Sequence, residues 1–187
     1  HKFHGDPGDE ANLYQVQCLA TSRDGIHFER QGMVVDTPPG MHHFRDPKVW
    51  RDGDSWYMIV GAREGDTGQV RLYRSADLRQ WQDAGVLDEA ESTMGYMWEC
   101  PDFFTLNGKR VLMFSPQGMQ AAGFSNRNLF QSGYLIGEWQ PGQRFIRHGE
   151  FREMDNGHDF YAPQSFATPD GRRIVIGWLD MWESPLP

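Results

Sequence analysis

The sequence predicts an all-β chain made of repeated sheets, as in a β-propeller. Short runs of alternating or β-branched residues recur between Gly, Asp, Asn and Pro, whereas apolar residues rarely recur at helical spacing. Similar segments also follow one another along the chain around Pro47, Pro101 and Pro163, and each interval can hold four short strands. We therefore expect almost no helix.

The individual elements follow from these runs. Strands are predicted at residues 13–19, 55–62, 69–73, 110–115, 133–136 and 172–178. Each repeat is expected to form one strand after its proline, a turn at Gly53, Gly108 or Gly171, and a second strand. A further similarity links residues 22–28 (SRDGIHF) with residues 75–81 (SADLRQW), each a polar turn followed by an aromatic residue.

A proline is tolerated at the first residue of a strand, because no ladder hydrogen bond is lost there. In a propeller the first strand of each blade lines the central channel. Residues shortly before the three prolines should therefore lie at one mouth of that channel. They include Asp46, Glu99 and, slightly further back, Asp159.

Composition narrows the range of partners. The chain has 187 residues, 39% of them hydrophobic, which suits a globular unit with a sizeable core. A net charge of -8 makes nucleic acid and anionic membrane surfaces unsuitable partners, and no apolar run is long enough to span a bilayer. Aromatic residues make up 13% of the chain, which suits either sugar binding or a β-rich core. The acidic balance favours a neutral ligand, and the aromatic content is compatible with a small-molecule saccharide.

Cysteine and histidine usage predicts neither a disulfide framework nor a metal site. Cys18 and Cys100 are far apart and form no Cys-x-x-Cys pair, so a reducing compartment, the cytoplasm, is expected. His42 and His43 with Asp46 resemble a metal cluster, but adjacent strand residues point to opposite faces. We expect no metal and no cofactor.

Two carboxylates are candidates for glycoside hydrolysis, in which one acid protonates the leaving oxygen and another attacks the anomeric carbon or stabilises its charge. Glu99 lies between Trp98 and Cys100, a weakly polar setting that disfavours the charged form, as a proton donor requires. Asp46 is next to Arg45, whose charge should keep it ionised for charge stabilisation. The alternative is that each acid caps a turn or pairs with a neighbouring base.

Four segments resemble motifs of glycoside hydrolase family 32, which contains invertases, sucrose-6-phosphate hydrolases, levanases and inulinases. Residues 43–49 (HFRDPKV) resemble its Arg-Asp-Pro motif, and residues 98–103 (WECPDF) its Glu-Cys motif. Residues 155–164 (DNGHDFYAPQ) and 176–178 (IGW) resemble a third and a fourth motif. The pattern is most similar to the bacterial sucrose-6-phosphate hydrolase branch.

The resemblance implies a five-bladed β-propeller, usually followed by a β-sandwich, and a retaining double displacement on β-fructofuranosides. It makes Glu99 the general acid and then the general base. It makes Asp46 the residue that binds fructosyl hydroxyls and stabilises the transition state, with Arg45 fixing its orientation. Asp159 and Trp178 would line the same fructosyl pocket.

One family motif is absent. The family's nucleophile is the Asp of an Asn-Asp-Pro-Asn-Gly segment, which this chain lacks. Asp6, in Gly-Asp-Pro-Gly, has no flanking asparagines and lies too close to Asp46, so it is expected to be a turn residue. We expect residues 1–187 to be a partial propeller of about two and a half to three blades, without a second domain, from the catalytic domain of a larger enzyme. On its own the chain should be inactive, and its open blade edges could pair with another copy.

Several alternatives stay open. The sequence does not distinguish sucrose, sucrose 6-phosphate, raffinose and fructans as substrates. A non-catalytic sugar-binding propeller would keep the aromatic pocket without turnover. A related five-bladed hydrolase with an inverting mechanism also uses three acids, although the Glu-Cys-Pro-Asp signature argues against it. Gln117 and residues 126–128 could reach the sugar or its phosphate.

Overall fold

The computed structural model describes residues 2–3, 12–91, 93–157, 159–180 and 183. This part of the chain contains strands and no α-helix, so the all-β prediction is confirmed. Among these residues, accordingly, no helix has the length and hydrophobicity needed to cross a membrane. The strands are β1 (Lys2–Phe3), β2 (Leu13–Tyr14), β3 (Gln17–Ser22), β4 (Phe28–Val35), β5 (His43–Asp52), β6 (Ser55–Glu64), β7 (Thr67–Ser75), β8 (Trp81–Glu89), β9 (Met97–Leu106), β10 (Lys109–Gln117), β11 (Gly133–Glu138), β12 (Ile146–Arg147), β13 (Arg152–Glu153), β14 (Tyr161–Ala167) and β15 (Arg173–Trp178).

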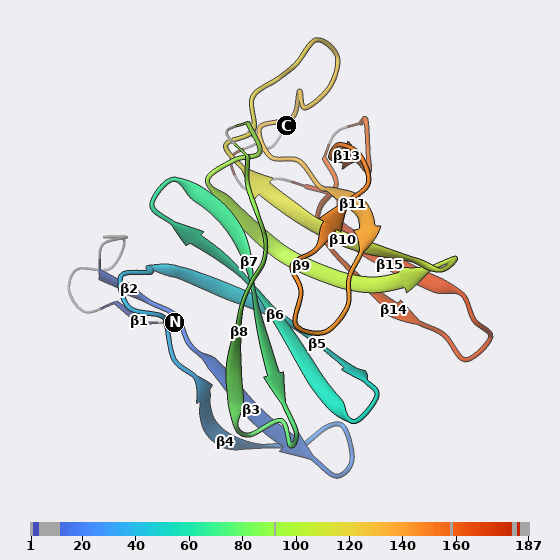
Figure 1. Cartoon of the computed structure of the whole chain (residues 1–187). Helices are drawn as coiled ribbons and strands as arrows, with labels where there is room; N and C mark the ends of the chain where they lie inside the picture. The colour runs from blue at the N-terminus through green and yellow to red at the C-terminus, as the bar shows by residue number, and fades with distance from the viewer. Residues whose placement is uncertain (1, 4–11, 92, 158, 181–182, 184–187) are drawn as a thin grey trace.

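Two larger antiparallel sheets form the body of the molecule. One has the order β5-β6-β7-β8, and the other has the order β12-β11-β10-β9 with β13 also on β11. Figure 1 shows them in sequence between the β3–β4 hairpin and the β14–β15 hairpin, while β1 pairs with β2. Strand β9 contacts β5 and β14, so the first strands of successive sheets lie next to one another. This is the arrangement of neighbouring blades around an axis.

The predicted strands agree with this order. The predictions at residues 55–62, 69–73, 110–115 and 133–136 fall within β6, β7, β10 and β11, and residues 172–178 correspond to β15. The prediction at 13–19 is interrupted, because it covers the end of one small sheet and the beginning of the β3–β4 hairpin. The prediction omits β4, which is mostly exposed, and β8, which mixes exposed, partly buried and buried residues, because no regular alternation of apolar and polar residues marks either strand.

The three proline repeats share one backbone irregularity. The register of each first strand shifts around its proline, in β5, in β9 and in β14. The residue before the proline has a positive φ in all three strands: Asp46 (65°), Cys100 (49°) and Ala162 (51°). Positive φ is unusual for residues other than glycine and concentrates at functional sites. The sequence repeat is therefore a repeated β-bulge.

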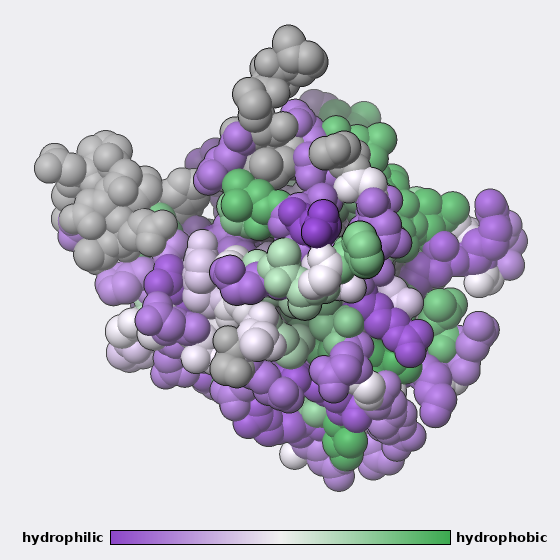
Figure 2. Space-filling model, turned by 90° about the horizontal axis from the view of Figure 1, so that it is seen from above, coloured by the Kyte–Doolittle hydropathy of each residue, from purple (hydrophilic) through white to green (hydrophobic). Residues whose placement is uncertain are grey.

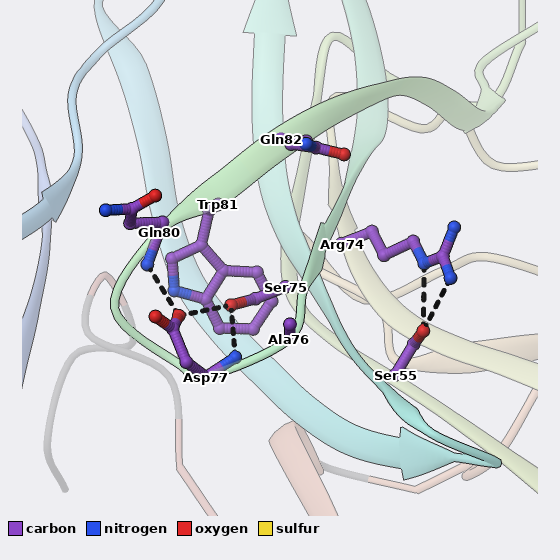
Figure 3. Close-up of a pocket in the computed structure, with 8 residues that line it drawn as sticks. All are labelled: Ser55, Arg74, Ser75, Ala76, Asp77, Gln80, Trp81 and Gln82. Atoms are coloured by element: carbon purple, nitrogen blue, oxygen red, sulfur yellow. Dashed lines mark hydrogen bonds between the residues drawn. The ribbon is translucent and has the colours of Figure 1, made fainter.

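The two turns that look alike in sequence also have the same hydrogen bonds. The Ser75 hydroxyl donates to Asp77, whose Oδ1 accepts the backbone N–H of Gln80 (Figure 3). The same oxygen also accepts the backbone N–H of Arg79. These N–H groups lower the pKa of Asp77. Ser22 and Asp24 form the same arrangement in the β3–β4 hairpin, with Ile26 and His27 as donors. Both are rigid turns at the ends of blades.

The main core lies between the two larger sheets. Trp98 is fully buried, stacks on Phe114 with ring centroids 3.9 Å apart, and donates its indole N–H to the Met94 carbonyl at 2.8 Å. Gly61 on β6 permits close approach, because a Cβ there would lie 2.2 Å from the Trp98 carbonyl oxygen. The segment of β9 that precedes Glu99 therefore packs closely against β6 of the β5-β6-β7-β8 sheet.

The outer surface is mixed. Figure 2 shows the molecule from above, with separate hydrophobic patches among predominantly hydrophilic residues. Several exposed large apolar side chains lie on the β14–β15 hairpin, including Phe166, Val175, Ile176 and Trp178. A two-stranded sheet leaves this apolar face and the edge of β15 without a further strand among the described residues.

Candidate active site

Three equivalent positions of the repeat meet at one point. Arg45 on β5, Glu99 on β9 and Tyr161 on β14 each lie two residues before the repeated proline. Arg45 donates to Glu99 Oε1 from Nε at 3.0 Å and from Nη2 at 2.6 Å. The Tyr161 hydroxyl donates to Glu99 Oε2 at 2.5 Å. The fold therefore brings together residues that are more than fifty positions apart in sequence.

A fourth donor completes the surroundings of Glu99. Gln117, the last residue of β10, donates from Nε2 to Glu99 Oε2 at 2.9 Å. Each carboxylate oxygen thus accepts two hydrogen bonds, and the side chain is only 12% exposed. Burial, together with the neighbouring Glu99 carboxylate, raises the pKa of Tyr161 well above its ordinary value, so Tyr161 stays a neutral donor. These contacts hold the Glu99 carboxyl group in one position.

The guanidinium of Arg45 is itself fixed from the other side. Its Nη1 lies 2.9 Å from His43 Nδ1 and donates to Gln15 Oε1 at 3.3 Å. Gln15 is buried and also accepts the backbone N–H of Phe44 at 2.9 Å. The plane of the guanidinium therefore cannot turn freely relative to Glu99.

Asp46 lies against the same strand as Glu99. Its Oδ2 accepts the Cys100 backbone N–H at 3.0 Å and lies 3.5 Å from Cys100 Sγ. Burial, reinforced by the Asp46 carboxylate, raises the pKa of the Cys100 thiol, so the thiol stays protonated and can donate. Asp46, on β5, thus contacts Cys100, the residue that follows Glu99 on β9. The two predicted carboxylates therefore belong to neighbouring strands of one region.

Arg45 was expected to fix the orientation of Asp46, but no hydrogen bond or ion pair joins the two among the described residues. Arg45 makes its ion pair with Glu99, across the boundary between two blades. Successive strand residues point to opposite sides, and the positive φ of Asp46 turns its side chain toward Cys100 instead. The carboxylate next to Arg45 in sequence is therefore not its ion-pair partner.

A second layer of polar residues lies further along the same three strands. We call Lys48, Asp102, Gln164 and Ser165 the channel cluster. Lys48 Nζ donates to Asp102 Oδ2 at 3.3 Å, to Gln164 Oε1 at 3.3 Å and to the Ser165 carbonyl at 2.6 Å. Asp102 is fully buried and also accepts the Ser165 N–H at 2.6 Å. The cluster ties β5, β9 and β14 together beneath the Glu99 site.

The other predicted residues lie nearby but are less constrained. Trp178 is the last residue of β15, is 43% exposed and pairs with Tyr161 in the β14–β15 register. Asp159 lies two residues before β14, is partly buried and has no hydrogen bond to a described residue. Asp6 lies outside the described residues, as does His158. No group of three His, Cys, Asp or Glu side chains suited to a metal occurs in the described ranges.

The pocket in Figure 3 does not belong to this site. It is lined by Ser55, Arg74, Ser75, Asp77 and Trp81, from the β5–β6 and β7–β8 turns. Because β5 runs away from Arg45, these turns lie at the opposite end of the sheet. Arg74 donates to the Ser55 hydroxyl from both Nε and Nη2, which fixes the orientation of its guanidinium.

Comparison with known proteins identifies the family. Residues 3–187 match the model for the glycosyl hydrolases family 32 N-terminal domain. The chain belongs to glycoside hydrolase family 32. This confirms the predicted resemblance and the partial propeller, since the N-terminal domain of family 32 is a five-bladed β-propeller.

Similar family 32 proteins come from bacteria and from an insect. The chain is 59% identical to Escherichia coli sucrose-6-phosphate hydrolase over 100% of its own length and 39% of that protein. It is 55% identical to Escherichia coli raffinose invertase, covering 97% of this chain and 38% of that protein. The Bombyx mori GH32 beta-fructofuranosidase structure matches with a TM-score of 0.86 and 44% identity, over 91% of this chain and 37% of that one. The family 32 chain thus spans well under half the length of these relatives.

Sequence reasoning missed part of the family 32 site. Tyr161 could have been found, because it occupies the position of Arg45 and Glu99 in the third repeat. Gln117 was considered only as a contact to sugar or phosphate. Gln15 belongs to no repeat and no motif, so only the folded structure reveals it.

Proposed function

We propose that the full-length protein containing this chain is an enzyme of carbohydrate metabolism that hydrolyses β-fructofuranosides with retention. The proposed substrate is sucrose or sucrose 6-phosphate. Membership of family 32 supports this, as do the names of the two Escherichia coli relatives. A mutant of the Bombyx mori enzyme has been solved in complex with sucrose. The observation that carries the proposal is the Glu99 carboxyl group, fixed by four donors beside Asp46.

In this proposal Glu99 acts first as an acid and then as a base. It gives a proton to the glycosidic oxygen as the bond to the fructosyl ring breaks, and later takes one from the attacking water. Asp46 accepts hydrogen bonds from fructosyl hydroxyls and stabilises positive charge on the ring. We assign the nucleophile, which a retaining mechanism places about 5 Å from the acid, to none of the described residues.

The remaining predicted residues take supporting roles. Arg45 orients Glu99 by its two hydrogen bonds to Oε1. Asp159, just before β14, and Trp178, the last residue of β15, are proposed to contact the fructosyl ring. We also propose a cytoplasmic location, supported by the two unpaired cysteines and testable by cell fractionation.

Replacement of Glu99 in the full-length protein tests the assignment. Glu99→Ala should lower kcat on sucrose by about 10²- to 10⁴-fold, the usual contribution of general acid–base catalysis. A near-normal rate would remove Glu99 from the mechanism. The 187-residue chain alone is expected to be inactive, so sucrose hydrolysis that depends on Glu99 in that chain would contradict the proposal.

Two further measurements address the alternatives. NMR of the first product should show β-fructofuranose, whereas an initial α-anomer would support the inverting hydrolase. If the full-length protein binds sucrose by calorimetry but shows no turnover, the non-catalytic sugar-binding propeller is supported instead.

A further inference from the structure

The two oxygens of Glu99 have partners of different kinds. Among the residues that the structure describes, Oε1 accepts only from Arg45, whose guanidinium carries five N–H donors and no acceptor. Oε2 accepts from the Gln117 amide and from the Tyr161 hydroxyl. A hydroxyl can turn to accept instead of donate, whereas a guanidinium cannot.

This difference matters when Glu99 carries a proton. A proton on Oε1 would face an Arg45 N–H, and His43 and Gln15 hold Arg45 in place. A proton on Oε2 requires only the Tyr161 hydroxyl to stop donating, and this hydroxyl can turn away. The Gln117 N–H can still donate to the remaining lone pair of Oε2. Oε2 is therefore the oxygen that can hold a transferable proton without opposing two donors.

We propose that Gln117 is a positioning residue: Arg45 confines the transferable proton of Glu99 to Oε2, and the hydrogen bond from Gln117 keeps Oε2 directed at the glycosidic oxygen. This inference rests on the proposed function, in which Glu99 is the acid. In the first step the O–H bond at Oε2 breaks as the proton joins the leaving oxygen. The resulting carboxylate then accepts from both Gln117 and Tyr161, as the structure shows.

The backbone around Gln117 is built to fix this donor. Its carbonyl accepts the Tyr96 N–H at 2.9 Å, and it pairs with Met97, two residues from Glu99. The contacts are close on both sides, because a Cβ on Gly95 would lie 2.2 Å from the Gln117 carbonyl and one on Gly118 would lie 2.4 Å from the Tyr96 ring. Gln117 thus has little freedom to move relative to the acid.

Substrates with different leaving groups test the assignment in the full-length protein. Gln117→Met keeps the length of the side chain but removes its donor. We expect kcat/KM on sucrose to fall about 10- to 100-fold, the equivalent of one hydrogen bond to a charged group. On β-fructosyl fluoride, whose leaving group needs little protonation, kcat/KM should fall less than about 3-fold, because protonation contributes little to that step. Gln120→Met is the matched control, since Gln120 is exposed and, within the described part of the chain, its side chain hydrogen-bonds only to the Gly118 carbonyl.

Gln117→Glu provides a second variant. Its carboxyl group can donate to Glu99 only when it is protonated, so kcat/KM on sucrose should recover toward the wild-type value as the pH falls. Gln117→Met should show no such recovery. This difference would show that the effect depends on a hydrogen-bond donor at position 117.

The outcomes separate the two proposals. An equal loss on both substrates, or no loss on sucrose, overturns the role of Gln117. If Glu99→Ala shows no loss specific to sucrose, the acid itself is wrongly assigned and the proposed function fails. If Glu99→Ala shows the loss and Gln117→Met does not, only the inference about Gln117 fails.

Discussion

Replacing Lys48 by methionine should destabilise the chain through the channel cluster. The substitution leaves Asp102, which is fully buried, with the Ser165 N–H as its one remaining donor among the described residues. Loss of one partner from a buried ion pair destabilises by about 3–5 kcal/mol. The Lys48 side chain is 24% exposed, which favours the lower end, so we expect a loss of about 3 kcal/mol. For a chain of this size that corresponds to a decrease of about 6–12 °C in Tm.

Urea unfolding followed by tryptophan fluorescence measures this effect in the 187-residue chain. Lys48→Met/Asp102→Asn should recover part of the loss, because the double variant no longer buries an unpaired charge. Lys109→Met is the matched control, since Lys109 is exposed at the start of β10. A loss below about 1 kcal/mol for Lys48→Met, or a double variant no more stable than the single one, would refute the reasoning.

Three other perturbations probe the pH response, the packing and the open edge. Burial raises the pKa of Tyr73 to about 12, so its contribution to stability is present below pH 10 and lost as the pH rises toward 12; Tyr73→Phe should avoid this loss of up to about 3 kcal/mol in urea unfolding across that range. Gly61→Ala should destabilise by about 1–3 kcal/mol in thermal unfolding, because its Cβ would meet the Trp98 carbonyl, and an unchanged Tm would contradict the close packing. Ile176→Lys on the exposed face of β15 should reduce any self-association of the chain in light scattering, whereas Ile146→Lys should not; equal effects would argue against pairing at β15.

The repeat was the part of the fold that could be predicted best. Proline at a strand start is a local signal, and each of the three prolines marks a bulge in the first strand of a sheet. Outer strands such as β8 are harder to predict, because their apolar and polar residues follow no regular alternation. The prediction therefore located the inner strands and missed part of the outer ones.

Within the site, only residues next to the repeated prolines could be predicted from the sequence. Asp46 and Glu99 were expected near one another, and the structure places Asp46 against the residue that follows Glu99. The ion pair of Arg45 with Glu99 was not predicted, because contacts between blades depend on the bulge geometry and not on neighbours in sequence. Gln117 reaches Glu99 from the end of an adjacent strand, a contact for which the sequence carries no local signal.

The placement of Glu99 on an inner strand has a consequence for how activity should be lost on heating. Arg45, Glu99 and Tyr161 all lie within hydrogen-bonded strands, beside a buried aromatic core. Strands of this kind open only with the whole domain, whereas sites on surface loops often melt first. In the complete protein, the temperature at which turnover is lost should therefore coincide with the calorimetric transition of the propeller.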